Sequence, residues 1–468
     1  MIKQIVAGTS NVLYSYVLII LLVVAGLWFT VRTRGAQFRL LGAQVKAVSE
    51  KSGEGKVSSF QALMVSTASR VGTGNIIGVS TALCLGGFGS VFWMWVIALV
   101  GAASAFVEST LAQIYKRRGP DGYCGGPAYY IEAALRCRPL AVVFSVLLIL
   151  TYGVGFNMLA SYNLQSTFSA YRFYTPAVTP WIIGAILAVI VGYCLIGGGK
   201  RIIRVTELLV PVMGVAYVLV ALIVTLINAP LLPEVLRRIF VGAFDLRAIF
   251  GGFGGSCVMY GIKRGLFSNE AGVGSAPNAS ASADVAHPAK QGLVQMLSVF
   301  IDTILVCSAT AFLCMCSGVE PTAALSGAPY VQASLSATLG GIGPIFITVA
   351  MVLFAFTTLL GNLYYVDRCV VHIMGRGLGK RTQIAIHVAA AAVIFVGAGL
   401  DAGLLWDLAD VLMGAMALIN VPVILYLGKY ALRALRDYER QRKQGREPVF
   451  RAESIGLAGK VECWHGEE

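Results

Sequence analysis

A short polar segment, Gly72-Thr73-Gly74-Asn75, interrupts an apolar stretch at residues 60–86. The stretch is long enough to cross a membrane as a helix, and in hydrocarbon every backbone amide and carbonyl needs a partner. Glycine allows unusual backbone angles, and unwinding releases backbone groups that can serve as ligands. Amides at a half-helix N-terminus suit a carboxylate, and carbonyls suit Na⁺ or an ammonium group. The segment therefore predicts a site for a small zwitterion and a cation.

Other polar side chains inside apolar stretches could complete such a site. Thr357 and Thr358 could give hydroxyl oxygens to a cation. Their alternative role is a bond to the carbonyl four residues earlier in the same helix. Asn163 lies near the end of the stretch 140–168, where its amide could bind a substrate carboxylate under the ring of Phe168. Polar contacts at the lipid headgroups are the alternative for these residues.

Ionisable residues inside spanning stretches are functional candidates, because burying a charge in a membrane is unfavourable. Arg70 lies about ten residues into its stretch, directly before the glycines. Glu108, Asp302 and Asp367 are the acids inside such stretches, and one of them could pair with Arg70 as a structural or gating ion pair. Asp302, with Thr303, could instead supply oxygens to a cation. For Glu108, anchoring or gating is as well supported as binding.

The composition indicates the class of protein that carries these residues. Of 468 residues, 57% are hydrophobic and 13% are charged, against roughly 25% charged in a soluble domain. Mean hydropathy is +0.77. These values exclude soluble, disordered and small disulfide-bonded proteins. The ten cysteines form no C-x-x-C pair and lie mostly in apolar stretches, which favours core packing over a zinc site. An all-α integral membrane protein remains.

Apolar stretches of spanning length recur along the chain. We predict eleven transmembrane helices, at residues 12–31, 60–86, 89–115, 140–168, 178–197, 206–228, 248–269, 291–316, 342–372, 383–400 and 404–428. With the N-terminus outside and the C-terminus cytoplasmic, 30 of the 36 Lys and Arg residues fall on the inner side, Lys263 and Arg264 among them. The net charge of +13 thus indicates orientation in the cell membrane and does not indicate nucleic-acid binding.

The odd number of helices divides into one leading helix and two groups of five with opposite orientation, the inverted repeat of many secondary transporters. The first helix of each group contains glycines, at 72–74 and at 251–255. Paired interruptions indicate a binding site at the bilayer midplane, whereas close helix packing is the alternative. The resulting segments are a leading helix (1–34), a basic cytoplasmic loop (35–59), two repeats (60–228 and 229–428) and a basic cytoplasmic tail (429–468).

Several strings resemble the alanine or glycine:cation symporters, a family of sodium-coupled amino-acid carriers. The resemblance extends from about residue 10 to residue 430. The strings that carry it are Gly265-Leu266-Phe267-Ser268-Asn269-Glu270-Ala271-Gly272, Gly274-Ser275-Ala276-Pro277-Asn278, Arg70-Val71-Gly72-Thr73-Gly74-Asn75-Ile76, Phe92-Trp93-Met94-Trp95-Val96, Gly125-Gly126-Pro127, Gln291-Gly292, Phe300-Ile301-Asp302-Thr303 and Phe354-Ala355-Phe356-Thr357-Thr358. The first string is the most specific, and it adds Asn269 and Glu270 to the gating or structural candidates.

The resemblance implies a leucine-transporter-type fold with one extra leading helix. The substrate-binding residues that it implies are Thr73, Gly74, Asn75, Asn163, Phe168, Thr358 and Asn362. The sodium ligands that it implies are Gly72, Thr357 and Thr358, partly through backbone carbonyls. Many members carry Trp at the position of Asn362, so a smaller polar residue here could admit a larger or polar substrate. Many members also carry Glu where Asp367 stands.

We therefore expect sodium-coupled symport of a small neutral amino acid, alanine or glycine, into the cell by alternating access. The expected partners are the amino acid, Na⁺ as coupling ion and the lipid bilayer, with no other cofactor and no nucleic acid. We do not expect an enzyme, because the sequence contains no nucleophile with a base and no metal pair. A carrier for a larger polar amino acid such as glutamine, and a sensor or channel without coupled transport, are the alternatives.

Overall fold

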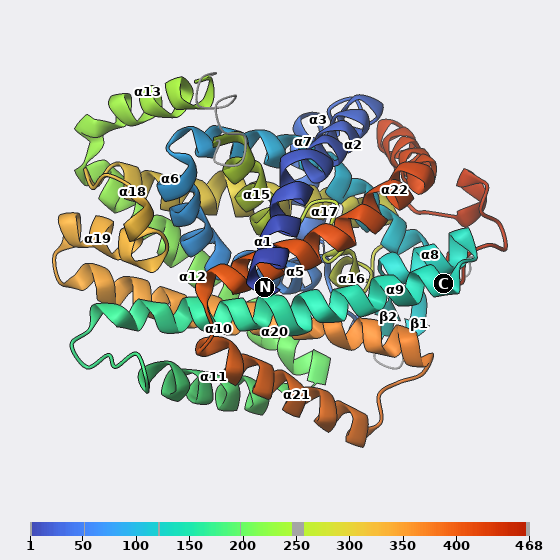
Figure 1. The fold of residues 1–468 in the computed structure, drawn as a ribbon. Coiled ribbons are helices and arrows are strands. Elements are labelled where there is room, and N and C mark those ends of the chain that lie inside the picture. Colours follow the sequence, from blue (N-terminus) through green and yellow to red (C-terminus); the bar gives the residue numbers. More distant parts are fainter. Residues whose placement is uncertain (1, 51, 120–121, 197, 246–256, 465–468) are drawn as a thin grey trace.

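The computed structural model of the chain describes residues 2–50, 52–119, 122–196, 198–245 and 257–464. This part is almost entirely helical (Figure 1). Within it, the strands form one antiparallel hairpin, β1 (Arg117–Gly119) with β2 (Gly122–Cys124). The predominantly helical fold that the composition predicts is confirmed.

Eight helical stretches of the described chain are long and apolar enough to cross a membrane, as expected of a multi-pass membrane protein. They are Lys3–Arg32, Gly89–Ile114, Arg138–Ala170, Gly198–Ile227, Pro288–Met315, Ile342–Met374, Lys380–Ala398 and Ala402–Lys443. Two shorter apolar helices, Gly74–Gly86 and Thr179–Leu195, coincide with the second and fifth predicted spans. The total of eleven, the inverted repeat and the orientation stay predictions.

Elements of the first half are α1 (Ile2–Val12), η1 (Leu13–Val17), α2 (Leu18–Arg32), α3 (Ala36–Arg39), α4 (Leu41–Val48), α5 (Ser59–Arg70), η2 (Gly74–Gly78), α6 (Val79–Gly86), α7 (Gly89–Ile114), α8 (Pro127–Leu135), α9 (Arg138–Leu148), η3 (Ile149–Gly155), α10 (Phe156–Ser166), η4 (Thr167–Ala170), α11 (Thr179–Leu195) and α12 (Gly198–Ile227). Those that follow are η5 (Ala229–Leu231), α13 (Leu232–Ala243), α15 (Cys257–Asn269), α16 (Pro277–Ser280), α17 (Pro288–Val299), η7 (Phe300–Cys307), α18 (Ser308–Met315), η8 (Ala323–Leu325), α19 (Ala328–Leu339), α20 (Ile342–Met374), α21 (Lys380–Ala398), α22 (Ala402–Lys443) and η9 (Ala452–Ile455).

Helix α7 forms the centre of the packing, with α15 and α17 along it, and all its residues from 100 to 114 are buried. The long helices α10 and α20 run side by side, and α11 and α21 pack together outside them (Figure 1). Helix α22 packs against α1 and α2. The interrupted segments after α5 and α15 thus lie among long, continuous helices.

The second predicted span is broken where its glycines predict. Helix α5 begins with a capping box, in which the Ser58 hydroxyl and the Gln61 side chain each accept from the other residue's backbone amide. It ends at Arg70, and Val71 leaves helical geometry with ψ of 81°. The chain resumes as the π-helical turn η2 and continues as α6. The interruption therefore precedes the polar residues that the sequence singles out.

A second interruption, which the sequence does not locate, directly follows the seventh predicted span. The predicted break at 251–255 lies outside the described residues. Between α15 and α16, however, the backbone is not helical, and Glu270, Gly272 and Gly274 have φ of 51°, 85° and 92°. Glycine adopts this conformation without steric strain, whereas Glu270 does not. The specific string around Asn269 and Glu270 thus forms a strained turn inside the molecule.

The charge count places Lys263 and Arg264 in an inner segment between spans, but in the structure they are buried in α15. Lys263 Nζ lies 2.9 Å from the Ser10 hydroxyl of α1 and 2.9 Å from Asp410 Oδ2 of α22. These contacts join α15 to the leading helix and to α22. The two cations are buried because Asp410 pairs with both, and Arg264 Nη2 lies 2.5 Å from its Oδ2. Charge counting misassigns them, since it treats every cation as solvent-exposed.

Candidate functional site

The interruption after α5 faces the middle of α20. A Cβ atom placed on Gly72 would lie 2.1 Å from the hydroxyl oxygen of Thr358, so this position has room for glycine only. Thr358 is 5% exposed, and its hydroxyl has no hydrogen-bond partner. A buried hydroxyl without a partner is unfavourable, and it is the kind of oxygen that a hard cation takes as a ligand. The structure therefore brings Gly72 and Thr358 together, as the sequence predicts.

Asn163 of α10 reaches the same interruption. Its Nδ2 donates to the hydroxyl of Thr73 over 3.1 Å, while its Oδ1 is buried without a partner. Three segments far apart in the sequence therefore meet here, namely the α5–η2 interruption, α10 and α20. We call the group of Gly72, Thr73, Asn163 and Thr358 the central site. It combines an unwound backbone with two unpartnered side-chain oxygens.

The structure does not bring the Thr357 hydroxyl to the central site. This hydroxyl donates to the carbonyls of Leu353 and Phe354 in its own helix, at 3.0 and 3.2 Å. It also lies 3.4 Å from the sulfur of Met213 in α12. Successive helical residues point about 100° apart, so only one of two adjacent threonines can face the interruption. Of the two threonines implied as sodium ligands, only Thr358 therefore has its hydroxyl facing the central site.

Asn75 stabilises the interruption from within. Its Oδ1 accepts from the Gly72 amide at 2.9 Å, and its Nδ2 donates to Asp302 Oδ1 at 2.7 Å. Asp302 also accepts from the hydroxyls of Ser268, at very short range, and Thr303, at 3.0 Å. In the described part of the chain no basic side chain lies within ion-pair distance of Asp302. This fully buried carboxylate is thus surrounded by neutral donors only.

An aromatic layer lies against Gly74, next to the central site, and the sequence does not predict it. The ring of Phe267 packs so closely on Gly74 that a Cβ there would lie 2.6 Å from it. Phe267 packs, with its ring tilted, between Phe156 of α10, at 4.6 Å between ring centroids, and Trp406 of α22, at 4.9 Å. The signal for Phe267 is its position inside the most specific string. Nothing in the sequence indicates that Trp406, 139 positions later, joins it.

Phe168 and Asn362, which the family resemblance implies as substrate contacts, contact other side chains of the protein. Phe168 lies in η4, where its ring packs on Tyr171 and Phe173 with centroids 6.1 and 6.4 Å away. Asn362 donates to Asn157 Oδ1 at 2.9 Å and accepts from the Ser69 hydroxyl at 2.7 Å. Asn362 therefore joins α5, α10 and α20 one turn from Thr358, while Phe168 belongs to an aromatic group at the end of α10.

Arg70 pairs with Glu270 and not with one of the three acids proposed from the sequence. Its Nε lies 4.0 Å from Glu270 Oε2, and its Nη1 donates to Gln295 and Ser298 at 3.1 Å each. Glu270 also accepts from the Ser275 hydroxyl at 2.5 Å. The pair is buried and joins the two interrupted segments directly. The sequence places Glu270 just beyond the end of a span, so it does not stand out as an acid buried within one.

The other acidic candidates lie apart from Arg70. Glu108 accepts from the Gly272 amide at 3.2 Å and from Asn420 Nδ2 at 2.9 Å, so it anchors the second interruption to α7 and α22. Asn269 Oδ1 caps the amide of Ala271 at 3.0 Å in the same turn. Asp367 lies at the far end of α20, where it lines a separate cavity. Glu108 and Asn269 therefore have structural contacts in the second interruption.

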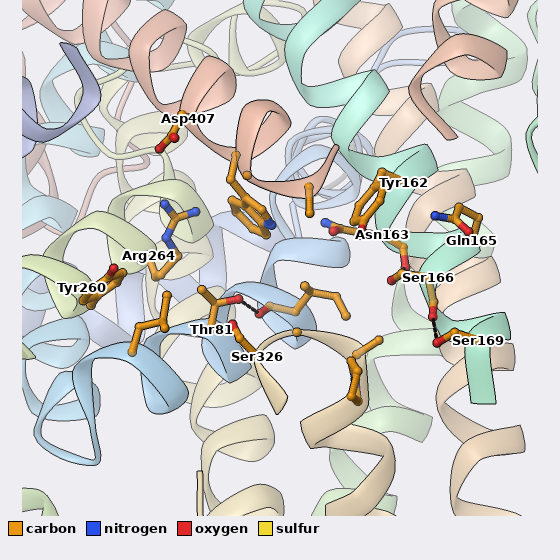
Figure 2. A pocket seen from close by; sticks show the side chains of 18 of the residues that line it. Thr81, Tyr162, Asn163, Gln165, Ser166, Ser169, Tyr260, Arg264, Ser326 and Asp407 are labelled. Atoms are coloured by element: carbon orange, nitrogen blue, oxygen red, sulfur yellow. Dashed lines mark hydrogen bonds between the residues drawn. The ribbon is translucent and has the colours of Figure 1, made fainter. Parts of the chain in front are cut away.

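A cavity of about 460 Å³ leads from the surface to the central site. Figure 2 shows Tyr162 and Asn163 of α10 on one side of it and Arg264 and Asp407 on the opposite side. Asn163 also donates to Thr73, so the cavity reaches the edge of the central site. We call this cavity the vestibule. Its volume lies in the range of small-molecule pockets, about 300–1,000 Å³.

Replacing Gly72 by alanine should abolish transport. The added methyl would overlap the Thr358 hydroxyl at 2.1 Å, and α20 is held there by the bonds of Asn362. Labelled amino-acid uptake into proteoliposomes should fall to background. Gly53→Ala is the matched control, because the nearest atom to a Cβ there is 3.5 Å away in the flexible side chain of Lys56. Full uptake by Gly72→Ala would contradict the close approach of these helices.

The chain is similar to known proteins along nearly its whole length. Residues 1–452 match the sodium:alanine symporter family. The chain is 42% identical over 461 residues to the amino-acid carrier protein AlsT of Bacillus subtilis, covering 98% of this chain and 97% of that protein. It is 41% identical over 466 residues to the probable sodium/glutamine symporter GlnT of the same organism, covering 99% and 96%.

Among solved structures, a manganese transporter of Eremococcus coleocola, determined as a mutant, has a similar fold. The TM-score is 0.51 at 13% sequence identity, over 84% of this chain and 81% of that one. At this identity the likeness concerns the fold alone, and it agrees with the transporter-type fold that the family resemblance implies. With the interrupted helices, the central site and a match across nearly its whole length, the chain belongs to the sodium:alanine symporter family, whose members are membrane transporters and not enzymes.

Proposed function

We propose that the protein carries a small neutral amino acid, alanine or glycine, into the cell together with Na⁺ by alternating access. The observation that carries this proposal is that Gly72 and Thr73 meet Asn163 and Thr358. The Oδ1 atom of Asn163 and the hydroxyl oxygen of Thr358 have no hydrogen-bond partner. A zwitterion offers a carboxylate and an ammonium group to such a site, and Na⁺ takes oxygen ligands. The closely packed Phe267 ring leaves little space for a side chain, which favours a small substrate.

Labelled alanine uptake into proteoliposomes tests the proposal. An inward Na⁺ gradient should drive accumulation above the equilibrium level, because each tenfold Na⁺ concentration ratio supplies about 1.4 kcal/mol per ion. An inside-negative membrane potential adds about 2.3 kcal/mol per charge per 100 mV. Equal uptake with K⁺ in place of Na⁺ would contradict sodium coupling. Binding without accumulation would instead indicate a sensor or a channel.

A carrier for glutamine is the second candidate. It is favoured by the similarity to a probable sodium/glutamine symporter and by the polar residue Asn362. Both ends of the Asn362 amide are already bonded, however, which weakens the argument from its identity. Unlabelled glycine should compete with labelled alanine more strongly than glutamine does. Stronger competition by glutamine would favour this second candidate.

We infer that Asp302 contributes to a cation site beside the central site. Its carboxylate meets the neutral donors Asn75, Ser268 and Thr303, and Arg70 is engaged by Glu270. A fully buried carboxylate without a cation is unfavourable, and a bound Na⁺ would supply the missing charge. Of the two roles that the sequence leaves open for Asp302, this contact pattern supports the cation role.

The variant Asp302→Asn should raise the sodium concentration for half-maximal uptake by roughly tenfold or more, since a lost charged ligand exceeds about 1.4 kcal/mol. The change keeps the size of the side chain and removes its charge. Asp284→Asn, which removes a carboxylate 3.1 Å from Lys56 in an exposed ion pair, should leave the sodium dependence unchanged. An unchanged sodium dependence in Asp302→Asn would exclude this carboxylate as a ligand.

A further inference from the structure

The vestibule contains a cation with unused hydrogen-bonding groups. Arg264 lines its wall and is 4% exposed, yet its Nε and Nη1 atoms have no hydrogen-bond partner. Only Nη2 is engaged, with Asp410. Three N–H bonds of a buried guanidinium are therefore unpaired, whereas buried charged groups are normally fully bonded. Arginine in this state is suited to an acceptor that arrives from the cavity, and a carboxylate is the strongest such acceptor.

The surrounding charges do not satisfy Arg264. Asp410 is shared, because the ammonium group of Lys263 lies 2.9 Å from the same carboxylate oxygen. Lys263 is itself positioned by the Ser10 hydroxyl of the leading helix. The other nearby acid, Asp407, lies 3.9 Å from Lys263, is 25% exposed and faces the vestibule. One wall of the vestibule thus presents an unpaired donor and an accessible acceptor, which complement the two ends of a zwitterion.

Arg264 also contacts the aromatic layer beside the central site. Its guanidinium lies 4.3 Å from the ring centroid of Trp406 and 5.6 Å from that of Phe267. A Cβ on Gly78 of η2 would contact both Trp406 and Arg264. A ligand on Nε or Nη1 would therefore lie beside the Trp406 indole. Trp406 packs on Phe267, and Phe267 packs on Gly74, so these rings link the vestibule wall to the central site.

We propose that the vestibule is a second, transient binding site for a zwitterionic amino acid, which docks its carboxylate on Arg264 and its ammonium group on Asp407 before it moves to the central site. The proposal rests on the proposed amino-acid transport. The protein itself supplies both charges at this docking site, so docking needs no Na⁺. The central site, in contrast, binds amino acid together with Na⁺. Sodium dependence thus distinguishes the two sites.

Equilibrium binding of labelled alanine to the purified full-length protein, in NaCl and in choline chloride, tests the proposal. In choline the wild type should bind weakly, and Arg264→Gln and Asp407→Asn should each weaken this binding by about tenfold, as for the loss of one charge-assisted hydrogen bond. Thr358→Val should remove the sodium-dependent binding and keep the binding in choline. Arg264→Gln leaves Asp410 paired with Lys263, and Asp407 is partly exposed, so both variants should fold.

Lys3→Gln is the matched control, since Lys3 is an exposed cation at the same end of the molecule, 2.9 Å from Asp401. It should bind as the wild type does. Absence of alanine binding to the wild type in choline, or unchanged binding by both vestibule variants, would overturn the docking site even if sodium-driven uptake is intact. Binding in choline without any sodium-driven uptake would instead contradict the proposed transport and keep the docking site.

Discussion

Thr358→Val is expected to abolish sodium-dependent uptake and to leave a folded protein. Valine has nearly the shape of threonine, so the only loss is a hydroxyl that has no partner within the protein. That hydroxyl lies against the interruption at Gly72, where the proposed Na⁺ needs oxygen ligands. Removal of one ligand from a site with few side-chain oxygens should weaken ion binding by about tenfold or more. Initial rates of labelled alanine uptake at graded Na⁺ concentrations measure this effect.

The neighbouring residue provides the control. Thr357→Val removes a hydroxyl that bonds only within its own helix and to Met213, so uptake should stay above about half of the wild-type rate. Size-exclusion profiles and thermal unfolding should be alike for both variants. Equal loss of uptake in the two variants would contradict the orientation of α20. Wild-type kinetics in Thr358→Val would exclude this residue from the sodium site.

Arg70→Gln should cause a severe loss of folded protein. Removing one partner of a buried ion pair costs about 3–5 kcal/mol, because the other charge remains buried. Glu270 would keep the Ser275 hydroxyl as a donor to its Oε2 but would lose its counter-charge, in a turn where it already has a positive φ. Thermal unfolding in detergent should show a markedly lower midpoint. The same loss is expected of Glu270→Gln, which leaves Arg70 without its acid.

The double variant Arg70→Gln with Glu270→Gln identifies the source of the loss. It removes both charges and should recover much of the stability, with a coupling free energy of about 0.5–3 kcal/mol. Arg237→Gln is the control, because its pair with Glu234 is closer, at 2.7 Å against 4.0 Å for Arg70 and Glu270, but exposed. This exposed pair should contribute less than about 1 kcal/mol. Strictly additive losses in the double variant would show that the two side chains do not depend on each other.

The sequence predicts the helical membrane fold and the first interruption well. Apolar runs of spanning length correspond to helices because lipid gives backbone groups no other partners. The interruption at Gly72 is visible in the sequence because two glycines and two polar residues stand inside such a run. The second interruption, at Glu270 and Gly272, is not visible in this way. It follows a less apolar segment, and the sequence pattern there resembles the end of a helix.

The partners of the polar residues depend on tertiary structure. The sequence offers three acids as equal candidates for an ion pair with Arg70, whereas in the structure Arg70 pairs with a fourth, Glu270. Two adjacent threonines are equivalent in composition, and the rotation of α20 against α5 selects Thr358. Buried cations such as Arg264 are misassigned for the same reason. Each of these choices depends on which distant helix packs opposite, and local sequence carries no record of that packing.

The sequence by itself determined the helical class, most spanning segments, the family and the position of the polar interruption in α5. These properties follow from local hydrophobicity and from the conformational freedom of glycine, which act over a few helical turns. Only the tertiary structure decided that Asn163 and Thr358 meet this interruption, that Phe267 and Trp406 pack beside it and that Arg264 faces the vestibule. These contacts join residues separated by tens to hundreds of positions, and helix packing determines which side chains meet.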